Sequence, residues 1–268
     1  MIKMHLLDSV TNTIITPFII ETEKGLVVID GGFESETENF LKHLTELGGK
    51  VCAWFMTHNH DDHMGVLATI LEKHLDKVQV DGVYYNYPSF DYIEKYGNEN
   101  EVESYNRLEN AAKTSGVKKI TPEKGDVYDF GNAKITMLYT PNENITNNSM
   151  NNTSIVFRLD TPDSSVLFLG DLGVEAGNDL IATVPHEKLR CDYVQMAHHG
   201  QQGVTKEVYE IIAPKCCLWC TPSWLWDNMG PNGYDSGNFK TVVVRGWMSE
   251  MGVKQHYVTK DGPFVIEI

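Results

Sequence analysis

The stretch that decides the fold follows a short apolar run and reads Thr57-His58-Asn59-His60-Asp61-Asp62-His63. Its histidines and Asp62 place three imidazoles and a carboxylate within six residues, and these nitrogen and oxygen ligands suit Zn²⁺. Alternate spacing lets His58 and His60 face one metal, while Asp62 and His63, at the start of a predicted helix, face another. The alternative is a polar loop with hydrogen-bonded histidines, and so dense a cluster argues against it.

Other polar residues stand where further predicted strands end. Asp30 closes a strand over residues 26–30, Asp171 follows one over residues 165–170, and His198 and His199 follow one over residues 193–197. Strand ends are where α/β sheets place their functional sites. A strand ending in Gly-Asp is also a common turn, so the assignment depends on order and spacing after the histidine cluster.

Apolar runs of strand length alternate with helical stretches along the chain, which is typical of an α/β layered domain. Strands are predicted over residues 13–20, 26–30, 51–56, 134–139, 153–159, 165–170, 193–197 and 216–220, and two more within 255–268. Helices are predicted over residues 35–47, 65–75, 99–113, 205–212 and 239–251. Since no linker-like stretch divides the chain, we expect one domain over residues 1–268.

The composition limits the partners. The formal net charge of −15 repels polyanions, so extended nucleic-acid binding is not expected. A small or short anionic substrate can still reach a bound dication, because the ion dominates the local field. No apolar run reaches the roughly 18 to 20 residues of a membrane span, and no secretory signal is recognisable. With an odd number of cysteines, typical of reduced thiols, we expect a cytoplasmic protein without a membrane partner.

The pattern His58-x-His60-x-Asp62-His63 after a buried strand resembles the signature of the metallo-β-lactamase superfamily. The resemblance extends over essentially the whole chain. It implies an α/β fold, the αβ/βα four-layer sandwich, in a single domain with two metals at the sheet edges.

The resemblance also implies residue roles. Asp30 would hold a ligand imidazole by a hydrogen bond, and Asp171 would bridge both metals. Of the two adjacent histidines, we expect His199 to complete the shell of the second metal. We expect His198 to act on the substrate as a proton donor or oxyanion contact. Asp62 would position the attacking water as well as bind metal.

One place departs from the superfamily pattern. Many members carry a further first-metal histidine in an H-T-P-G-H stretch, but here Tyr139-Thr140-Pro141 occupies it and the next histidine is His186. The first metal would then rely on His58, His60 and Asp171, helped by Asn151, Asn152 or water. We expect Zn²⁺ at both positions, with Mn²⁺ as the alternative because the ligands shift towards oxygen.

A subgroup resemblance points to a reaction. Residues 151–156, 168–171 and 198–200 look like the soluble hydrolase domain of bacterial competence DNA-uptake channel proteins, a domain associated with phosphodiester cleavage. We therefore expect a hydrolase in which two metal ions ionise a water that attacks a phosphoester, most specifically a phosphodiester. Two alternatives stay open. The same site could hydrolyse a lactone, thioester or amide, or the chain could be a metal-bound sensor or scaffold without turnover.

Overall fold

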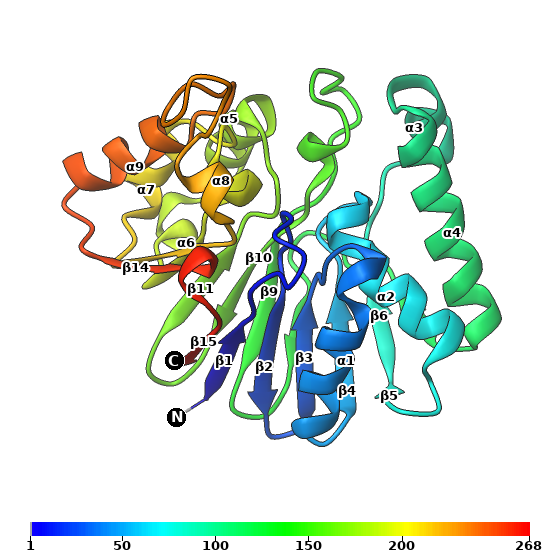
Figure 1. Ribbon diagram of the computed structural model, residues 1–268. Helices are drawn as coiled ribbons and strands as arrows, with labels where there is room; N and C mark the ends of the chain where they lie inside the picture. The colour runs from blue at the N-terminus through cyan, green and yellow to red at the C-terminus, as the bar shows by residue number, and fades with distance from the viewer. Residues whose placement is uncertain (1) are drawn as a thin grey trace.

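The computed structural model describes residues 2–268 and shows two β-sheets packed against each other with helices on both outer sides (Figure 1). The first sheet has the order β15-β1-β2-β3-β4-β6-β7, with β5 paired to β4. Its strands are β1 (Lys3–Leu6), β2 (Phe18–Thr22), β3 (Gly25–Ile29), β4 (Lys50–Phe55), β5 (Gln79–Val80), β6 (Gly82–Tyr84), β7 (Lys118–Ile120) and β15 (Phe264–Glu267).

The second sheet has the order β14-β13-β12-β11-β10-β9-β8. Its strands are β8 (Val127–Asp129), β9 (Lys134–Tyr139), β10 (Val156–Asp160), β11 (Ser165–Phe168), β12 (Tyr193–Gln195), β13 (Cys216–Trp219) and β14 (Gln255–Val258). Both sheets are mixed. The strand pairs β3–β4 and β11–β12 are parallel, so the carboxyl ends of each pair lie at the same edge of their sheet.

Helices cover the outer face of each sheet. On the first sheet lie α1 (Thr37–Glu46), α2 (Asp61–Lys73) and α4 (Glu99–Ser115), with α3 (Phe90–Tyr96) preceding α4. On the second lie α5 (Val174–Thr183), α6 (His186–Leu189), α7 (Lys206–Ile212), α8 (Ser223–Trp226) and α9 (Thr241–Glu250). Short 3₁₀ turns η1 (Glu34–Glu36), η2 (Asn151–Thr153), η3 (Ala197–Gly200) and η4 (Thr259–Asp261) lie between them.

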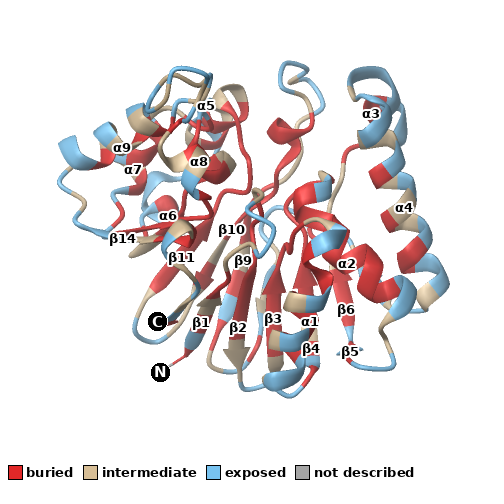
Figure 2. Ribbon diagram, viewed as in Figure 1, coloured by how far each residue is buried: buried red, intermediate tan, exposed pale blue. Residues whose placement is uncertain are grey.

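Strand alternation explains the layers. In β4, Ala53 and Phe55 face the second sheet and Trp54 faces α1 and α2. Val51 lies on the same side as Trp54, because the pairing of β3 with β4 is irregular at this point. Phe55 packs on Phe157 of the second sheet with ring centroids 5.4 Å apart. Within residues 2–268 the three large apolar cores lie between the sheets and under each helical layer, and a small fourth cluster surrounds Ile93. In Figure 2 the strands are buried and the outer faces of the helices are exposed.

The predicted α/β fold and four-layer sandwich are therefore confirmed. One predicted strand, over residues 13–20, is wrong in its first half, because β2 begins only at Phe18. The preceding segment is a loop whose polar groups bond locally, with the Thr13 N–H donating to Ser9 Oγ at 3.0 Å. This loop brings Thr16 to the sheet edge, with consequences for the site.

Candidate metal centre

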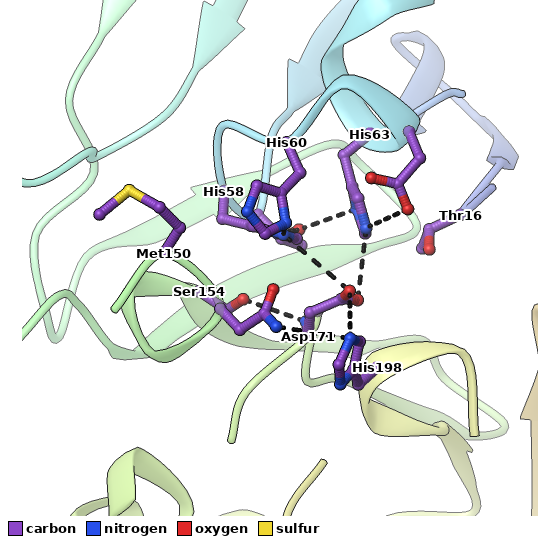
Figure 3. A network of polar contacts seen from close by, with 12 residues as sticks. Thr16, His58, His60, His63, Met150, Ser154, Asp171 and His198 are labelled. Carbon is purple, nitrogen blue, oxygen red and sulfur yellow. Dashed lines mark hydrogen bonds and ion pairs between the residues drawn. The ribbon is translucent and has the colours of Figure 1, made fainter. Parts of the chain in front are cut away.

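The predicted site residues meet at the edge where parallel strands of both sheets end. Residues 58–63 follow β4 and run into α2, Asp171 follows β11, and His199 lies in η3 after β12. In Figure 3 the histidines after β4 lie opposite Asp171 and His198, with dashed contacts converging on the Asp171 carboxylate. Two candidate ligand groups are present, and Asp171 belongs to both.

The first of them, which we call the inner group, consists of Asp62, His63, Asp171 and His199, all of them buried. His63 Nε2 lies 3.3 Å from Asp171 Oδ1, and His199 Nε2 lies 3.2 Å from Asp171 Oδ2. From Asp62 Oδ2 the distances are 2.9 Å to His199 Nε2 and 3.7 Å to His63 Nε2. Ligands about 2.1 Å from a tetrahedral ion would stand about 3.4 Å apart, so this donor set fits Zn²⁺.

Unsatisfied atoms support that fit. His63 Nε2, Asp171 Oδ1 and His199 Nε2 are buried and make no hydrogen bond of good geometry, although they lie within ion-pair distance of polar atoms of their own group. Buried polar atoms are almost always paired, because leaving them unpaired costs free energy. Three such atoms aimed at one point are what a cation site requires, and a divalent ion would satisfy all of them.

The outer group consists of His58, His60 and Asp171. His58 Nε2 lies 3.0 Å from His60 Nδ1 and 4.0 Å from Asp171 Oδ2. The His58 side chain is fully buried, whereas that of His60 is 24% exposed. Within residues 2–268 no further histidine joins this group, in keeping with the missing H-T-P-G-H histidine.

Asp30 lies behind the inner group. Its Oδ2 accepts from His63 Nδ1 at 2.8 Å, and Thr57 donates to both carboxylate oxygens, from its N–H and from its hydroxyl, each at 2.7 Å. The bond fixes the His63 ring with Nε2 towards the centre. Asp30 adopts a left-handed φ of 50°, a conformation uncommon outside glycine, asparagine and aspartate. The predicted hydrogen bond from a ligand imidazole is thus present.

The adjacent histidines point to different places. Both have left-handed backbone, with φ values of 53° for His198 and 56° for His199. His199 enters the inner group, and its Nδ1 lies 3.5 Å from the Thr16 hydroxyl. His198 lies on the open side, where its Nδ1 donates to the Gln202 carbonyl at 3.1 Å. Its Nε2 is directed at the centre, 3.8 Å from Asp171 Oδ2.

The two asparagines proposed to help the first metal also differ. Asn151 Nδ2 lies 3.4 Å from His198 Nε2, and its buried Oδ1 has no partner. The Asn152 amide is occupied elsewhere, since its Oδ1 accepts from the N–H groups of Gly173 and Ala176 at the start of α5. The side-chain oxygen of Asn152 is therefore not free to help the first metal. Its bond to Gly173 instead supports the loop that carries Asp171.

Electrostatics separate the two groups. Burial opposes protonation of His199, but the carboxylates of Asp171 and Asp62 outweigh it and raise its pKa to about 9. The pKa of His63 is raised well above its usual value, because Asp171, Asp30 and Asp62 overcome burial. Burial and the neighbouring imidazoles instead hold the pKa of His58 well below its usual value. A cation at the inner group must therefore displace protons, whereas His58 already presents a free nitrogen.

Sequence reasoning missed Glu101, from the first turn of α4. Its Oε1 accepts from His60 Nε2 at 2.8 Å. Burial alone would raise the pKa of Glu101, but the hydrogen bonds from His60 and the Asn98 N–H outweigh it and lower the pKa. The only signal in the sequence is the Asn98-x-x-Glu101 capping pattern, which predicts a helix start and no functional role.

Beside His60 a groove of about 350 Å³ opens between the start of α4 and the loop over residues 146–151. It is lined by His60, Tyr96, Asn98, Glu101, Asn148 and Asn151, among others. The Ser149 hydroxyl donates to the Tyr96 carbonyl at 2.8 Å and ties the two walls together. The groove therefore joins the outer group and has the position of a substrate-binding surface.

Comparison with known proteins supports the fold and the family. A family model described as "Metallo-beta-lactamase superfamily" matches residues 10–210. A curated relative, ComE operon protein 3 of Bacillus subtilis, is 27% identical over 215 residues, which cover 73% of this chain and 25% of that protein. The chain thus spans about a quarter of that relative's length.

Two solved structures share the whole fold. The metallo-β-lactamase fold protein YhfI from Bacillus subtilis aligns with a TM-score of 0.57 at 12% identity, covering 100% of both chains. Igni18, described as a novel metallo hydrolase from the archaeon Ignicoccus hospitalis, gives a TM-score of 0.56 at 12% identity, again over 100% of both chains. Within residues 2–268, no helix combines the length and apolar character needed to cross a bilayer.

Proposed function

The chain belongs to the metallo-β-lactamase superfamily, and on that premise we propose that it hydrolyses phosphodiesters with two divalent metal ions held by the inner and outer groups. One observation carries the proposal. Buried nitrogen and oxygen atoms that make no hydrogen bond of good geometry converge around one carboxylate, Asp171. Divalent ions bound there would lower the pKa of water towards neutrality and offset negative charge on a phosphoryl oxygen.

The protein's own groups have distinct tasks. Asp171 stays ionised, because His199 and His63 overcome burial and hold its pKa well below the usual value. Asp62, at the first turn of α2, can bind an ion and orient the attacking water through its second oxygen. The Nδ1–H of His198 is bonded to the Gln202 carbonyl and burial lowers the pKa of this imidazole, so an unprotonated Nε2 faces the centre. It can take a proton from the attacking water and then pass it to the leaving oxygen.

The groove beside His60 supports a diester over more highly charged substrates. Among the described residues that line it, none is lysine or arginine, and the one formal charge, Glu101, is bonded to His60. Sites for dianionic phosphate groups normally supply such cations. Asparagine amides, hydroxyls and the Tyr96 ring suit an uncharged leaving group with hydroxyls and a ring, such as a sugar or nucleoside. The resemblance to the competence hydrolase domain points the same way.

The metal and the compartment follow by the same reasoning. We propose Zn²⁺ at the inner group, with its two imidazoles and two carboxylates. The outer group, with two imidazoles and a shared carboxylate, accepts Zn²⁺ or Mn²⁺. All five cysteines are free in the structure, which supports a reducing compartment such as the cytoplasm.

A substrate panel tests the proposal. Zn²⁺- and Mn²⁺-loaded protein would be assayed on bis(p-nitrophenyl) phosphate, p-nitrophenyl phosphate, p-nitrophenyl phosphorylcholine, a lactone and a β-lactam. Asp171→Ala serves as the control for contaminating hydrolases. We expect the diesters to be cleaved fastest and the monoester at least tenfold more slowly. Faster cleavage of the lactone or β-lactam would show that the site hydrolyses another type of bond. Metal binding without turnover of any substrate would favour a sensor or scaffold.

A further inference from the structure

The carboxylate of Glu101 connects the outer group to a peripheral helix. Its Oε1 lies 2.8 Å from His60 Nε2, and its Oε2 accepts from the Asn98 N–H at 2.6 Å. The Glu101 side chain is 16% exposed, and its bond to His60 is partly buried, whereas its bond to Asn98 lies at the exposed start of α4. One carboxylate therefore serves an imidazole and the cap of α4 at once.

That bond decides which nitrogen of His60 is available. A carboxylate oxygen accepts, so Nε2 carries the proton and Nδ1 is left with a free lone pair. Nδ1 is the nitrogen that lies 3.0 Å from His58 Nε2, within the outer group. At the inner group the two nitrogens have the opposite roles. His63 donates its Nδ1–H to Asp30, and the free lone pair of Nε2 faces the centre.

Two more contacts attach the same stretch of chain to α4. The Asn59 side-chain amide donates to the Glu101 carbonyl at 3.0 Å, and the Ser104 hydroxyl bonds the Asp61 carboxylate. Three consecutive residues of the motif, 59–61, are thus held by the first two turns of one helix. This exceeds what a chance surface contact with His60 would provide.

We propose that Glu101 is a positioning residue that holds His60 with Nδ1 presented to the outer metal, so that α4 sets the affinity of this position. The inference rests on the proposed two-metal centre. Carboxylates that accept from a ligand imidazole fix its tautomer and raise its basicity, and their loss typically weakens metal binding about 10- to 100-fold.

The chain offers variants that separate this role from helix capping. Glu101→Ala removes both bonds, whereas Glu101→Gln keeps an oxygen that can accept from His60 Nε2. In α4 the Asn98 side chain caps the helix by accepting from the Asn100 and Glu101 N–H groups. Asn98→Ala removes this cap and leaves the bond between Glu101 and His60 in place. Glu99→Gln removes one charge from the same exposed turn without touching the motif.

The readout is Zn²⁺ affinity, measured by titrating the metal-free full chain against a chromogenic chelator and resolving two sites. We expect Glu101→Ala to weaken the outer site about 10- to 100-fold and Glu101→Gln to weaken it less, with the inner site unchanged. Glu99→Gln should leave both affinities unchanged. Asn98→Ala should lower Tm by about 2–4 °C and leave both affinities unchanged.

Two results would overturn the inference. Wild-type affinity at the outer site in Glu101→Ala would show that the carboxylate does not position His60. An equal loss in Asn98→Ala would assign the effect to the helix start instead. The proposed function fails separately, if protein with both ions bound cleaves no phosphodiester, and the affinities of the Glu101 variants still decide this inference.

Discussion

The inner and outer groups share Asp171 but differ in what holds their imidazoles. At the inner group, His63 in the first turn of α2 is held by Asp30 at the end of β3, and both side chains are completely buried. At the outer group, His60 is held by Glu101, with side-chain exposures of 24% and 16%, and the carboxylate belongs to a helix outside the sheets. The same carboxylate–imidazole chemistry thus has a rigid support in one place and a more adjustable one in the other.

The comparison predicts unequal affinities. Preorganised ligands lose less freedom on binding, so the inner group should bind its ion more tightly than the outer. The outer group has one carboxylate where the inner group has two, and it adjoins the groove, where a substrate would approach. The predictions below test how far the two groups act separately.

The largest effect is expected from Asp171→Ala, because this carboxylate belongs to both groups. We expect loss of both ions and a fall in kcat/KM on the order of 1,000-fold, which corresponds to roughly 4 kcal/mol of lost transition-state stabilisation. Assays with metal analysis would check this, with the exposed Asp163→Ala as the matched control. Retention of one tightly bound ion would show that the carboxylate is not shared.

A pair of histidine variants should separate the groups. His60→Ala should lose the outer ion and keep the inner one, whereas His199→Ala should lose the inner ion. Each should lower activity on the order of 100-fold, since a two-metal reaction needs both positions. Metal content after gel filtration is the measurement. Loss of both ions in His60→Ala would mean that the groups cannot be occupied independently.

Asp30→Asn should have a smaller effect, concentrated at the inner group. The amide keeps the shape of the carboxylate but removes its charge from His63 Nδ1. We expect the inner-site affinity for Zn²⁺ to fall about 10- to 100-fold, with less change at the outer site. The measurement is a competition titration of both variants with Zn²⁺. Glu101→Gln should show the reverse pattern, with the larger loss of affinity at the outer site. A larger loss at the outer site would contradict the assignment of Asp30.

The smallest expected effect is a difference in pH dependence. Because the pKa of His199 is raised to about 9, the inner ion must displace a proton below that pH. Its affinity should rise at least about tenfold per pH unit between pH 7 and 9, and more steeply where His63 also loses a proton. His58, whose pKa is held well below its usual value, predicts a flatter profile for the outer site. Titrations at several pH values would reveal equal slopes if this contrast is wrong.

Stability of the metal-free protein should change in the opposite direction. Protonated His199 stabilises the fold fully below the unfolded pKa of about 6.5, and this contribution disappears as pH rises through about 9. Thermal unfolding of the metal-free chain should therefore show that the contribution of His199 to stability falls between about pH 7 and 9, where the inner-site affinity for Zn²⁺ rises. A parallel rise of both quantities would contradict the sign.

Much of this molecule could be predicted from local patterns. The continuous apolar runs at residues 26–30 and 51–56 marked strands, and they are β3 and β4. The concentration of histidines and aspartates within residues 58–63 indicated metal ligands. Asp171 and His199 follow strands of the other sheet, and it was their order and spacing, together with the superfamily resemblance, that predicted their place beside that stretch.

The rest depended on long-range contacts that leave no local trace. Glu101 lies 41 residues beyond His60, in a capping pattern typical of many helices. Asn152 followed a plausible pattern, yet its amide is taken by the start of α5. The loop that brings Thr16 to His199 had the apolar content of a strand, and its polar contacts prevent that conformation.

Anomalous diffraction from crystals of the Zn²⁺-loaded chain tests the central claim most directly. We predict two anomalous peaks about 3.5 to 4 Å apart, one among Asp62, His63 and His199 and one beside His58 and His60, with Asp171 between them. A single peak, or peaks away from these side chains, would contradict the two-metal account.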